Sequence, residues 1–97
     1  SGFDVVIANP PYVKEYVNKS AFDGLRDLPY YQGKMDIWYF FACKGIDLLR
    51  KFGIITFIAQ NNWVTSYGSK KMRNKVITET ISFNPMLHGV ILKCNHY

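Results

Sequence analysis

The sequence has little of what would place it in several large protein classes. It has two cysteines, Cys43 and Cys94, which form no C-x-x-C pair, so neither a zinc site nor a disulfide framework is indicated. No apolar run approaches the roughly 18 residues that a membrane span needs. No basic segment followed by an apolar stretch opens the chain either. We therefore expect free thiols, no signal peptide, no membrane contact and a cytoplasmic location.

Closely spaced glycines are also absent. Of the seven glycines, no two are separated by a single residue, so the sequence contains no G-x-G. The α/β domains that bind nucleotide cofactors place such a turn after their first strand, because the backbone must come close to the ligand there. These 97 residues therefore carry no such cofactor turn.

Acidic residues are fewer than basic ones. Twelve Lys and Arg against seven Asp and Glu give a formal net charge of +5. This charge permits contact with a polyanion such as nucleic acid, although many small domains carry the same balance as a plain surface property. A hydrophobic fraction of 48% with 16% aromatics is typical of one small globular unit with a buried core.

The hydrophobic pattern predicts an α/β arrangement. Short apolar runs over residues 3–8 and 54–59 predict two buried strands. Residues 34–51 carry apolar side chains at helical spacing, and Gly53 is a suitable residue to end that helix. Strand, helix and strand in this order predict a βαβ unit with a parallel strand pair.

The rest of the chain is less regular. Residues 13–32 are expected to form a long loop with one helical turn near 20–25, and such loops are usually functional or mobile. A basic helix is predicted over 69–79, capped by Ser66 or Ser69. Its charged face, which we expect to meet water or a partner, consists of Lys70, Lys71, Arg73 and Lys75. One or two short strands are expected after it.

One motif follows the first predicted strand directly. Residues 9–12 read Asn9-Pro10-Pro11-Tyr12. The prolines fix φ and remove two N–H donors, so the backbone cannot continue a sheet ladder, and Asn9 is held extended. The loop thus presents a planar amide, bare carbonyl oxygens and an aromatic ring, which suits a grip on a flat group carrying –NH₂. Simple strand termination is the alternative.

The motif and the segments after it resemble the amino-group methyltransferases that use S-adenosylmethionine, and most closely the DNA adenine-N6 family of restriction–modification enzymes. The matching strings, over roughly residues 2 to 80, are the run from Phe3 to Val13, Gly33-Lys34-Met35-Asp36, residues 48–55, Asn62-Trp63, and Tyr67-Gly68 with Met72-Arg73. The resemblance implies a partial Rossmann-like class I methyltransferase fold with a parallel βαβ core and flanking helices. It also implies S-adenosylmethionine as cofactor, double-stranded DNA as partner, and a bacterial or archaeal cytoplasm.

The resemblance assigns roles to the motif. The side-chain oxygen of Asn9 and the carbonyl oxygen of Pro10 match the two acceptors of the target amine. Such hydrogen bonds strengthen as charge develops on nitrogen, so they act in the transition state. Pro11 is expected near the methyl donor, with Asn9 completing this partial cofactor site. Tyr12 is expected to stack on an adenine flipped out of the duplex. No metal is implied.

Four further residues are candidate contacts with DNA. Lys34 opens the helix predicted beside the same cleft. Trp63 lies in the loop after the second strand, at the sheet edge where α/β proteins bind ligands, and packing against the long aromatic loop stays open for it. Lys70 and Arg73 belong to the basic helix, for which a solvated surface is the alternative.

The missing cofactor turn also bears on domain organisation. We expect residues 1–97 to be a fragment of a single methyltransferase catalytic domain, with the catalytic loop and the second half of the sheet. The cofactor-binding half, including the acid that holds the cofactor ribose in the family, would be absent, so the isolated piece should be inactive. Its first strand would then lack a neighbour, and an unpaired apolar edge favours self-association.

Two other functions stay open. The enzymes that methylate a glutamine side chain of translation release factors share the Asn-Pro-Pro-Tyr loop. They usually continue with a short acidic run containing proline, unlike the aromatic stretch over residues 30–41 here. A non-catalytic basic module that binds nucleic acid would explain the charge but not the motif.

Overall fold

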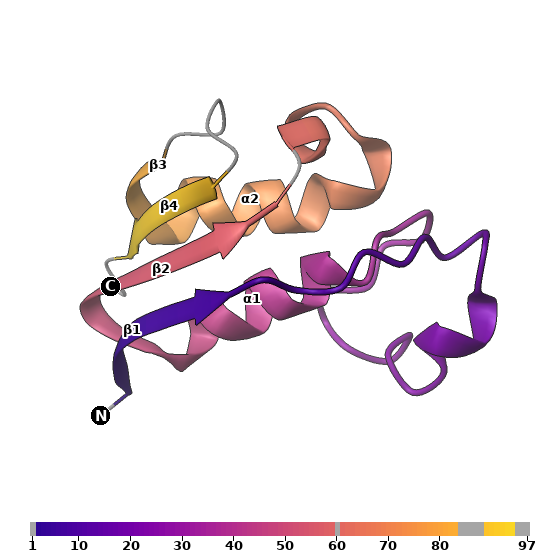
Figure 1. Cartoon of the computed structure of the whole chain (residues 1–97), viewed down its shortest axis with the longest axis horizontal. Helices are drawn as coiled ribbons and strands as arrows, with labels where there is room; N and C mark the ends of the chain where they lie inside the picture. Colours follow the sequence, from indigo (N-terminus) through magenta and orange to yellow (C-terminus); the bar gives the residue numbers. More distant parts are fainter. Residues whose placement is uncertain (1, 60, 84–88, 95–97) are drawn as a thin grey trace.

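A four-stranded sheet and two helices make up the fold. The computed structural model describes residues 2–59, 61–83 and 89–94. The elements are β1 (Phe3–Ala8), η1 (Lys19–Phe22), α1 (Trp38–Leu48), β2 (Leu49–Ile58), η2 (Asn61–Val64), η3 (Tyr67–Ser69), α2 (Lys70–Glu79), β3 (Thr80–Phe83) and β4 (Gly89–Cys94), where η marks a short 3₁₀ helix. The strand order β1-β2-β4-β3 puts β1 at one edge (Figure 1).

The parallel βαβ core is confirmed. β1 and β2 run parallel, with Val5 opposite Ile54 and Ala8 opposite Phe57, and α1 connects them. β4 pairs antiparallel with β2, and β3 pairs antiparallel with β4. The sheet is therefore mixed. The edge position of β1 agrees with the expected open strand, while self-association through it stays a prediction.

The helix between the parallel strands is shorter than its sequence pattern predicts. The pattern spans residues 34–51, but α1 covers only Trp38–Leu48 and the chain passes directly into β2 at Leu49. Gly53, the expected helix end, lies inside β2. The prediction of this boundary was wrong because pairing with β1 draws Leu49 into the sheet, and no local preference reports that contact.

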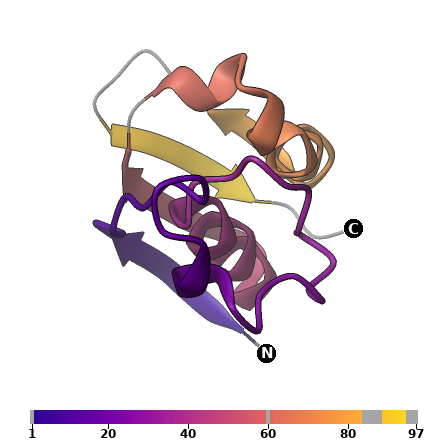
Figure 2. The ribbon, with the colours of Figure 1, turned by 90° about the vertical axis from the view of Figure 1, so that its right-hand side faces the viewer.

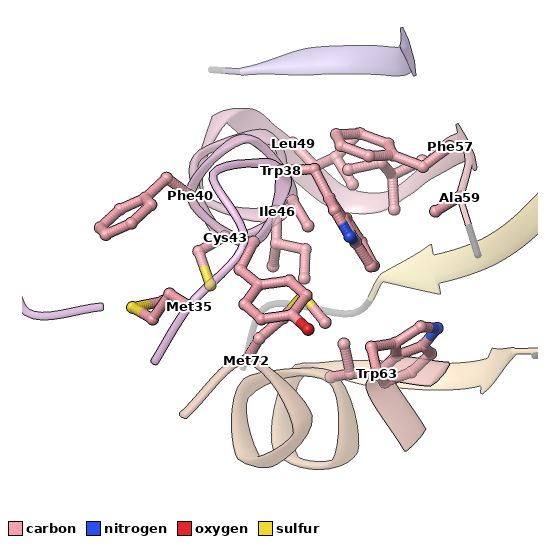
Figure 3. Close-up of a cluster of buried hydrophobic side chains, with 14 of the residues drawn as sticks. Met35, Trp38, Phe40, Cys43, Ile46, Leu49, Phe57, Ala59, Trp63 and Met72 are labelled. Carbon is pink, nitrogen blue, oxygen red and sulfur yellow. The ribbon is translucent and has the colours of Figure 1, made fainter. Parts of the chain in front are cut away.

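The two helices cover one face of the sheet (Figure 2). Side chains alternate along the strands, so Ile55 and Phe57 are buried toward the helices, whereas Val5, Ile7 and Ile54 are exposed on the other face. Figure 3 shows the core. Its side chains come from α1, α2, β2 and the segments that flank these elements. The buried core residues are Phe22, Met35, Trp38, Tyr39, Phe40, Ala42, Cys43, Ile46, Leu49, Ile55, Phe57, Ala59, Trp63, Met72 and Val76.

Helix α1 comes very close to the sheet at Gly45. A Cβ atom at this position would lie 2.6 Å from Cδ1 of Ile55. Glycine in a helix costs about 1 kcal/mol relative to alanine, and here it permits the helix to settle on β2. Gly45 is thus unfavourable for helix propensity, but it is needed for the close packing of α1 on β2.

An ion-pair cluster joins the two helices. The ammonium group of Lys75 lies 2.7 Å from Asp47 Oδ1 on α1 and 2.7 Å from Glu79 Oε2 on α2. The sequence predicted that Lys75 faces water or a partner, and this prediction was wrong, because its side chain is only 16% exposed.

None of the helices within the described residues has the length and apolar character needed to cross a membrane.

Candidate active site at the carboxyl ends of the parallel strands

The Asn-Pro-Pro-Tyr loop leaves β1 next to the end of β2. Pro10 is buried, and Asn9, Pro11 and Tyr12 are exposed. The Tyr12 hydroxyl donates a hydrogen bond to the carbonyl oxygen of Ile58, the last residue of β2. Tyr12 nevertheless stays 44% exposed. The loop therefore presents an amide and an aromatic ring at the sheet edge, with the ring anchored by its hydroxyl.

The Tyr12 hydroxyl is held in its protonated form. Burial raises the pKa of Tyr12 above its ordinary value of 10.0, and the negative charge of Asp36 raises the pKa further. At neutral pH the hydroxyl thus remains a donor, which is what its bond to the Ile58 carbonyl requires.

A buried carboxylate ties the end of this loop to α1. Asp36 is 3% exposed, and its Oδ1 accepts hydrogen bonds from the N–H groups of Val13 at 3.1 Å and Trp38 at 3.3 Å. Lys14 Nζ lies 3.3 Å from Asp36 Oδ2. The Ile37 N–H also donates to the carbonyl oxygen of Val13 at 2.9 Å. The chain just after Tyr12 is therefore fixed to the start of the helix.

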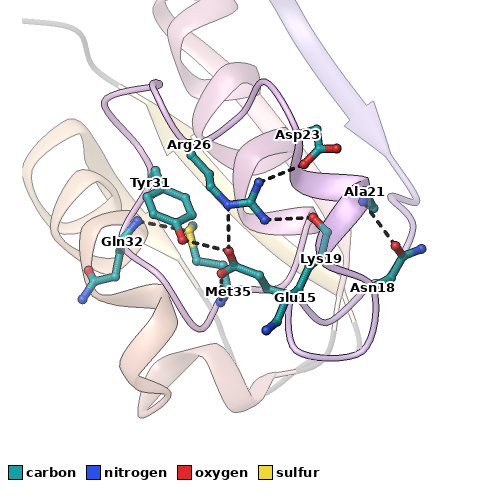
Figure 4. A network of polar contacts seen from close by, with 9 residues as sticks. All are labelled: Glu15, Asn18, Lys19, Ala21, Asp23, Arg26, Tyr31, Gln32 and Met35. Atoms are coloured by element: carbon teal, nitrogen blue, oxygen red, sulfur yellow. Dashed lines mark hydrogen bonds and ion pairs between the residues drawn. The ribbon is translucent and has the colours of Figure 1, made fainter.

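A second acid orders the long loop that follows (Figure 4). Glu15 Oε2 accepts a hydrogen bond from the Tyr31 hydroxyl at 2.8 Å and lies 3.5 Å from Arg26 Nε. Arg26 also donates to Asp23 at 3.0 Å and to the carbonyl oxygen of Lys19 at 2.8 Å. The predicted long loop is thus internally cross-linked, and its expected helical turn is η1.

The turn before α1 touches the loop after β2. A Cβ atom at Gly68 would lie 1.8 Å from the carbonyl oxygen of Lys34, so the two backbones meet there and only glycine fits. Lys34 has a positive φ of 54° and follows Gly33, whose φ is 91°. The Lys34 ammonium lies 5.4 Å from the centre of the Tyr67 ring, and Tyr67 is 64% exposed. This contact brings a lysine and a tyrosine together on the surface.

The loop after β2 is closed by its own Ser69 hydroxyl and by Arg73 of helix α2. The Ser69 hydroxyl is fully buried and bonds the carbonyl oxygens of Trp63 and Ser66. The Arg73 guanidinium donates to the carbonyl oxygen of Trp63 at 3.0 Å, to Ser69 Oγ at 2.6 Å and to the Ser66 carbonyl oxygen. Ser69 thus binds carbonyl oxygens of the loop, which differs from the helix cap that the sequence suggested.

The four predicted DNA contacts differ in exposure. Lys34 and Lys70 are exposed, and DNA contact by them stays a prediction. Trp63 is 3% exposed and packs edge-on against Trp38, with ring centres 6.5 Å apart. Arg73 is engaged with the loop. Direct DNA contact by Trp63 and Arg73 is therefore disfavoured. Trp63 packs inside the protein, as the alternative to DNA contact predicted, but its ring partner is Trp38 and not the long aromatic loop.

Sequence reasoning did not find the polar groups that hold the two loops. The sequence pattern singled out Asp36 only as part of the string Gly33-Lys34-Met35-Asp36, and its bond to the Trp38 N–H is local, across two positions. Its bond to Val13 crosses 23 positions, which no local pattern signals. Ser69 carried a signal only as a cap. Within the described residues no cluster of three or more His, Cys, Asp or Glu could hold a metal ion.

Comparison with known proteins identifies the family of this chain. Residues 1–85 match the sequence model of the family described as Eco57I restriction-modification methylase. A curated relative, the type II restriction enzyme and methyltransferase RM.Eco57I of Escherichia coli, is 28% identical over 94 residues. The alignment covers 84% of this chain and 9% of the relative, so the chain spans a small part of that protein's length. The match over most of the chain shows that it belongs to the Eco57I restriction-modification methylase family.

Proposed function

We propose that the protein containing this chain transfers a methyl group from S-adenosylmethionine to the N6 amine of an adenine flipped out of double-stranded DNA, within a restriction–modification system. One observation carries the proposal: Asn9 is exposed directly after β1, and three residues later the exposed Tyr12 ring is anchored by its hydroxyl on the end of β2. Family membership favours DNA over a release-factor glutamine as the acceptor. In this proposal, residues 1–97 are part of one Rossmann-like catalytic domain.

The proposed chemistry depends on two acceptors. The adenine amine is a poor nucleophile because its lone pair is delocalised into the ring. The Asn9 side-chain oxygen and the Pro10 carbonyl oxygen accept hydrogen bonds from its two N–H groups and favour a more tetrahedral nitrogen. With S-adenosylmethionine bound, the nitrogen would bond to the methyl carbon as the carbon–sulfur bond breaks, and the amine proton would leave to water after transfer. Because the acceptor bonds strengthen with charge on nitrogen, they lower the barrier.

Tyr12 supplies the surface for the flipped base. Stacking of a base on an aromatic ring contributes about 1–3 kcal/mol, which offsets much of the cost of taking the base out of the duplex. The exposed fraction of Tyr12 and the anchored hydroxyl support this role. The exposed Lys34 and Lys70 are proposed phosphate contacts, since lysine neutralises phosphate regardless of sequence.

The residues present fit the reactive end of the methyl donor. S-adenosylmethionine supplies an electrophilic methyl group on a cationic sulfonium. Pro11 is exposed and has no N–H donor to repel a cation, and Asn9 offers an amide oxygen. The described part of the chain has no G-x-G turn for the nucleoside, so in this proposal other parts of the protein hold it. No step of the reaction requires a metal.

The test identifies the product made by the full-length protein that contains this chain. It is incubated with unmethylated DNA and isotope-labelled S-adenosylmethionine, and the nucleosides are analysed by mass spectrometry. We expect labelled N6-methyladenine, and its loss in Asn9→Ala. The matched control Asn74→Ala removes the same side chain from the exposed face of α2 and should retain activity. Label on cytosine, or an Asn9→Ala protein as active as wild type, would refute the proposal.

A further inference from the structure

We infer that Asp36 is a positioning residue of the Asn-Pro-Pro-Tyr loop, which sets the ring of Tyr12 through the main chain of Val13. The inference rests on the proposed function of that loop. Asp36 is 3% exposed and belongs to the segment before α1. It therefore supports the loop through a hydrogen bond to the main chain and is not itself open to a ligand. It deepens the proposed site by naming the group that orients its aromatic surface.

The hydrogen-bond and ion-pair partners of the Asp36 carboxylate lie mainly in the loop. A buried carboxylate is tolerated only where donors compensate for lost hydration. Asp36 has three donors: Val13 N–H at 3.1 Å, Trp38 N–H at 3.3 Å and the Lys14 ammonium at 3.3 Å. Two of the three come from the residues that directly follow Tyr12. The carboxylate is therefore devoted mainly to the end of the catalytic loop.

Tyr12 lies between two anchors. On one side its hydroxyl is bonded to the Ile58 carbonyl oxygen at the end of β2. On the other side its neighbour Val13 donates to Asp36 and accepts from the Ile37 N–H. With backbone and hydroxyl both fixed, the ring is oriented before any base arrives. Such preorganisation matters because small misplacements of positioning groups reduce rates strongly.

A plain helix cap is the competing explanation, since Asp36 also bonds the first N–H of α1. Three substitutions separate the two roles. Asp36→Asn keeps an oxygen of the same reach for both N–H groups. Asp36→Ser keeps a good cap but is too short to maintain the bond to Val13. Asp36→Ala removes both bonds. Lys14→Met is a matched control that removes the ion pair and leaves both hydrogen bonds.

The experiment measures kcat, KM for DNA and thermal unfolding of these variants in the full-length protein. It also records the fluorescence of 2-aminopurine placed at the target base, which brightens on flipping and is quenched by an aromatic face. We expect Asp36→Asn and Lys14→Met to stay within about threefold of wild-type kcat. For Asp36→Ser and Asp36→Ala we expect kcat to fall tenfold or more with a nearly unchanged KM, in line with the roughly 100-fold effect of misplacement. Their bound complexes should be brighter than that of wild type.

A double-mutant cycle tests whether Asp36 acts through Tyr12. If it does, adding Asp36→Ala to Tyr12→Ala changes kcat by less than about twofold, because coupled residues are not additive. The inference would be overturned if the double variant lost kcat by the product of the two single-variant factors. A wild-type kcat in Asp36→Ser would overturn it as well.

Failure of the proposed function is distinguishable, because it shows in the wild type as an absence of methyladenine. Amide hydrogen exchange then still decides on Asp36: protection of the Val13 N–H must persist in Asp36→Asn and be lost in Asp36→Ser. Protection that is equal in all variants would refute the inference without any activity measurement.

Discussion

The loops that follow β1 and β2 leave the sheet at the same end, where the two parallel strands finish, and they use their polar groups in opposite ways. After β1, Asn9 and Tyr12 are exposed, and the loop is held by groups outside it, Asp36 and the Ile58 carbonyl oxygen. After β2, the Ser69 hydroxyl is buried and satisfies carbonyl oxygens of its own loop. The first loop keeps polar and aromatic groups available for a ligand, whereas the second uses them to maintain its shape.

This difference predicts two kinds of mutational effect. Substitutions of Asn9 and Tyr12 in the loop after β1 should change the reaction and leave stability nearly intact, because these two side chains are exposed. Substitutions in the loop after β2 should lower the free energy of unfolding first, since they leave buried carbonyl oxygens without donors.

Asn9→Ala should give the largest effect, and only on catalysis. Removal of one acceptor that acts in the transition state typically costs about 10²–10³ in rate. DNA affinity should change little, because phosphate contacts on other surfaces dominate it. Methyl transfer and gel-shift affinity measured on the same preparation decide the matter. Equal losses in both would make Asn9 a structural residue and erase the contrast.

Arg73→Ala should lower the free energy of unfolding by roughly 1.5–3 kcal/mol, the range for hydrogen bonds to a charged group. The guanidinium joins the Trp63 and Ser66 carbonyl oxygens to Ser69. Arg73→Lys serves as the control that keeps the charge but loses the planar fork, and should be intermediate. Urea unfolding supplies the measurement. Full stability of Arg73→Ala with weakened DNA binding would instead support a phosphate contact.

Gly68→Ala should destabilise by about 1–3 kcal/mol, as overpacking usually does. The added Cβ would lie 1.8 Å from the Lys34 carbonyl oxygen, so one backbone must move. Gly24→Ala is a matched control, because nothing lies within 4 Å of its Cβ position. That position has a φ of 83°, so its own cost comes from strain alone. Thermal unfolding of the two variants separates crowding from strain, and an unperturbed Gly68→Ala would contradict the contact.

Tyr12→Phe should give the smallest effect. The ring remains, and loss of the hydrogen bond to the Ile58 carbonyl oxygen lowers the free energy of unfolding by about 0.5–1.5 kcal/mol. Tyr12→Ala should additionally forfeit the roughly 1–3 kcal/mol of base stacking. Fluorescence of 2-aminopurine at the target base distinguishes them, because only Tyr12→Ala should brighten the bound complex strongly. Identical signals for both variants would remove stacking as the role of the ring.

Much of the site's location was predictable from sequence, and little of its support was. A strand over residues 3–8 running into two prolines specifies where the loop begins, because proline cannot continue a ladder. The bonds from Val13 to Asp36 and from Tyr12 to Ile58 link positions 23 and 46 apart. Neither link has a periodic or compositional signature, so sequence patterns could not reveal them.

Local backbone chemistry and the hydrophobic pattern are enough to specify β1, the proline-stiffened loop after it and the parallel βαβ core. The boundary between α1 and β2 depends instead on long-range packing, since pairing with β1 recruits Leu49. Only the tertiary structure decided that Arg73 and Lys75 bind other parts of this chain instead of facing outward. The physical reason is that a charged side chain has the same local pattern whether its partner is water, phosphate or a distant segment of its own chain.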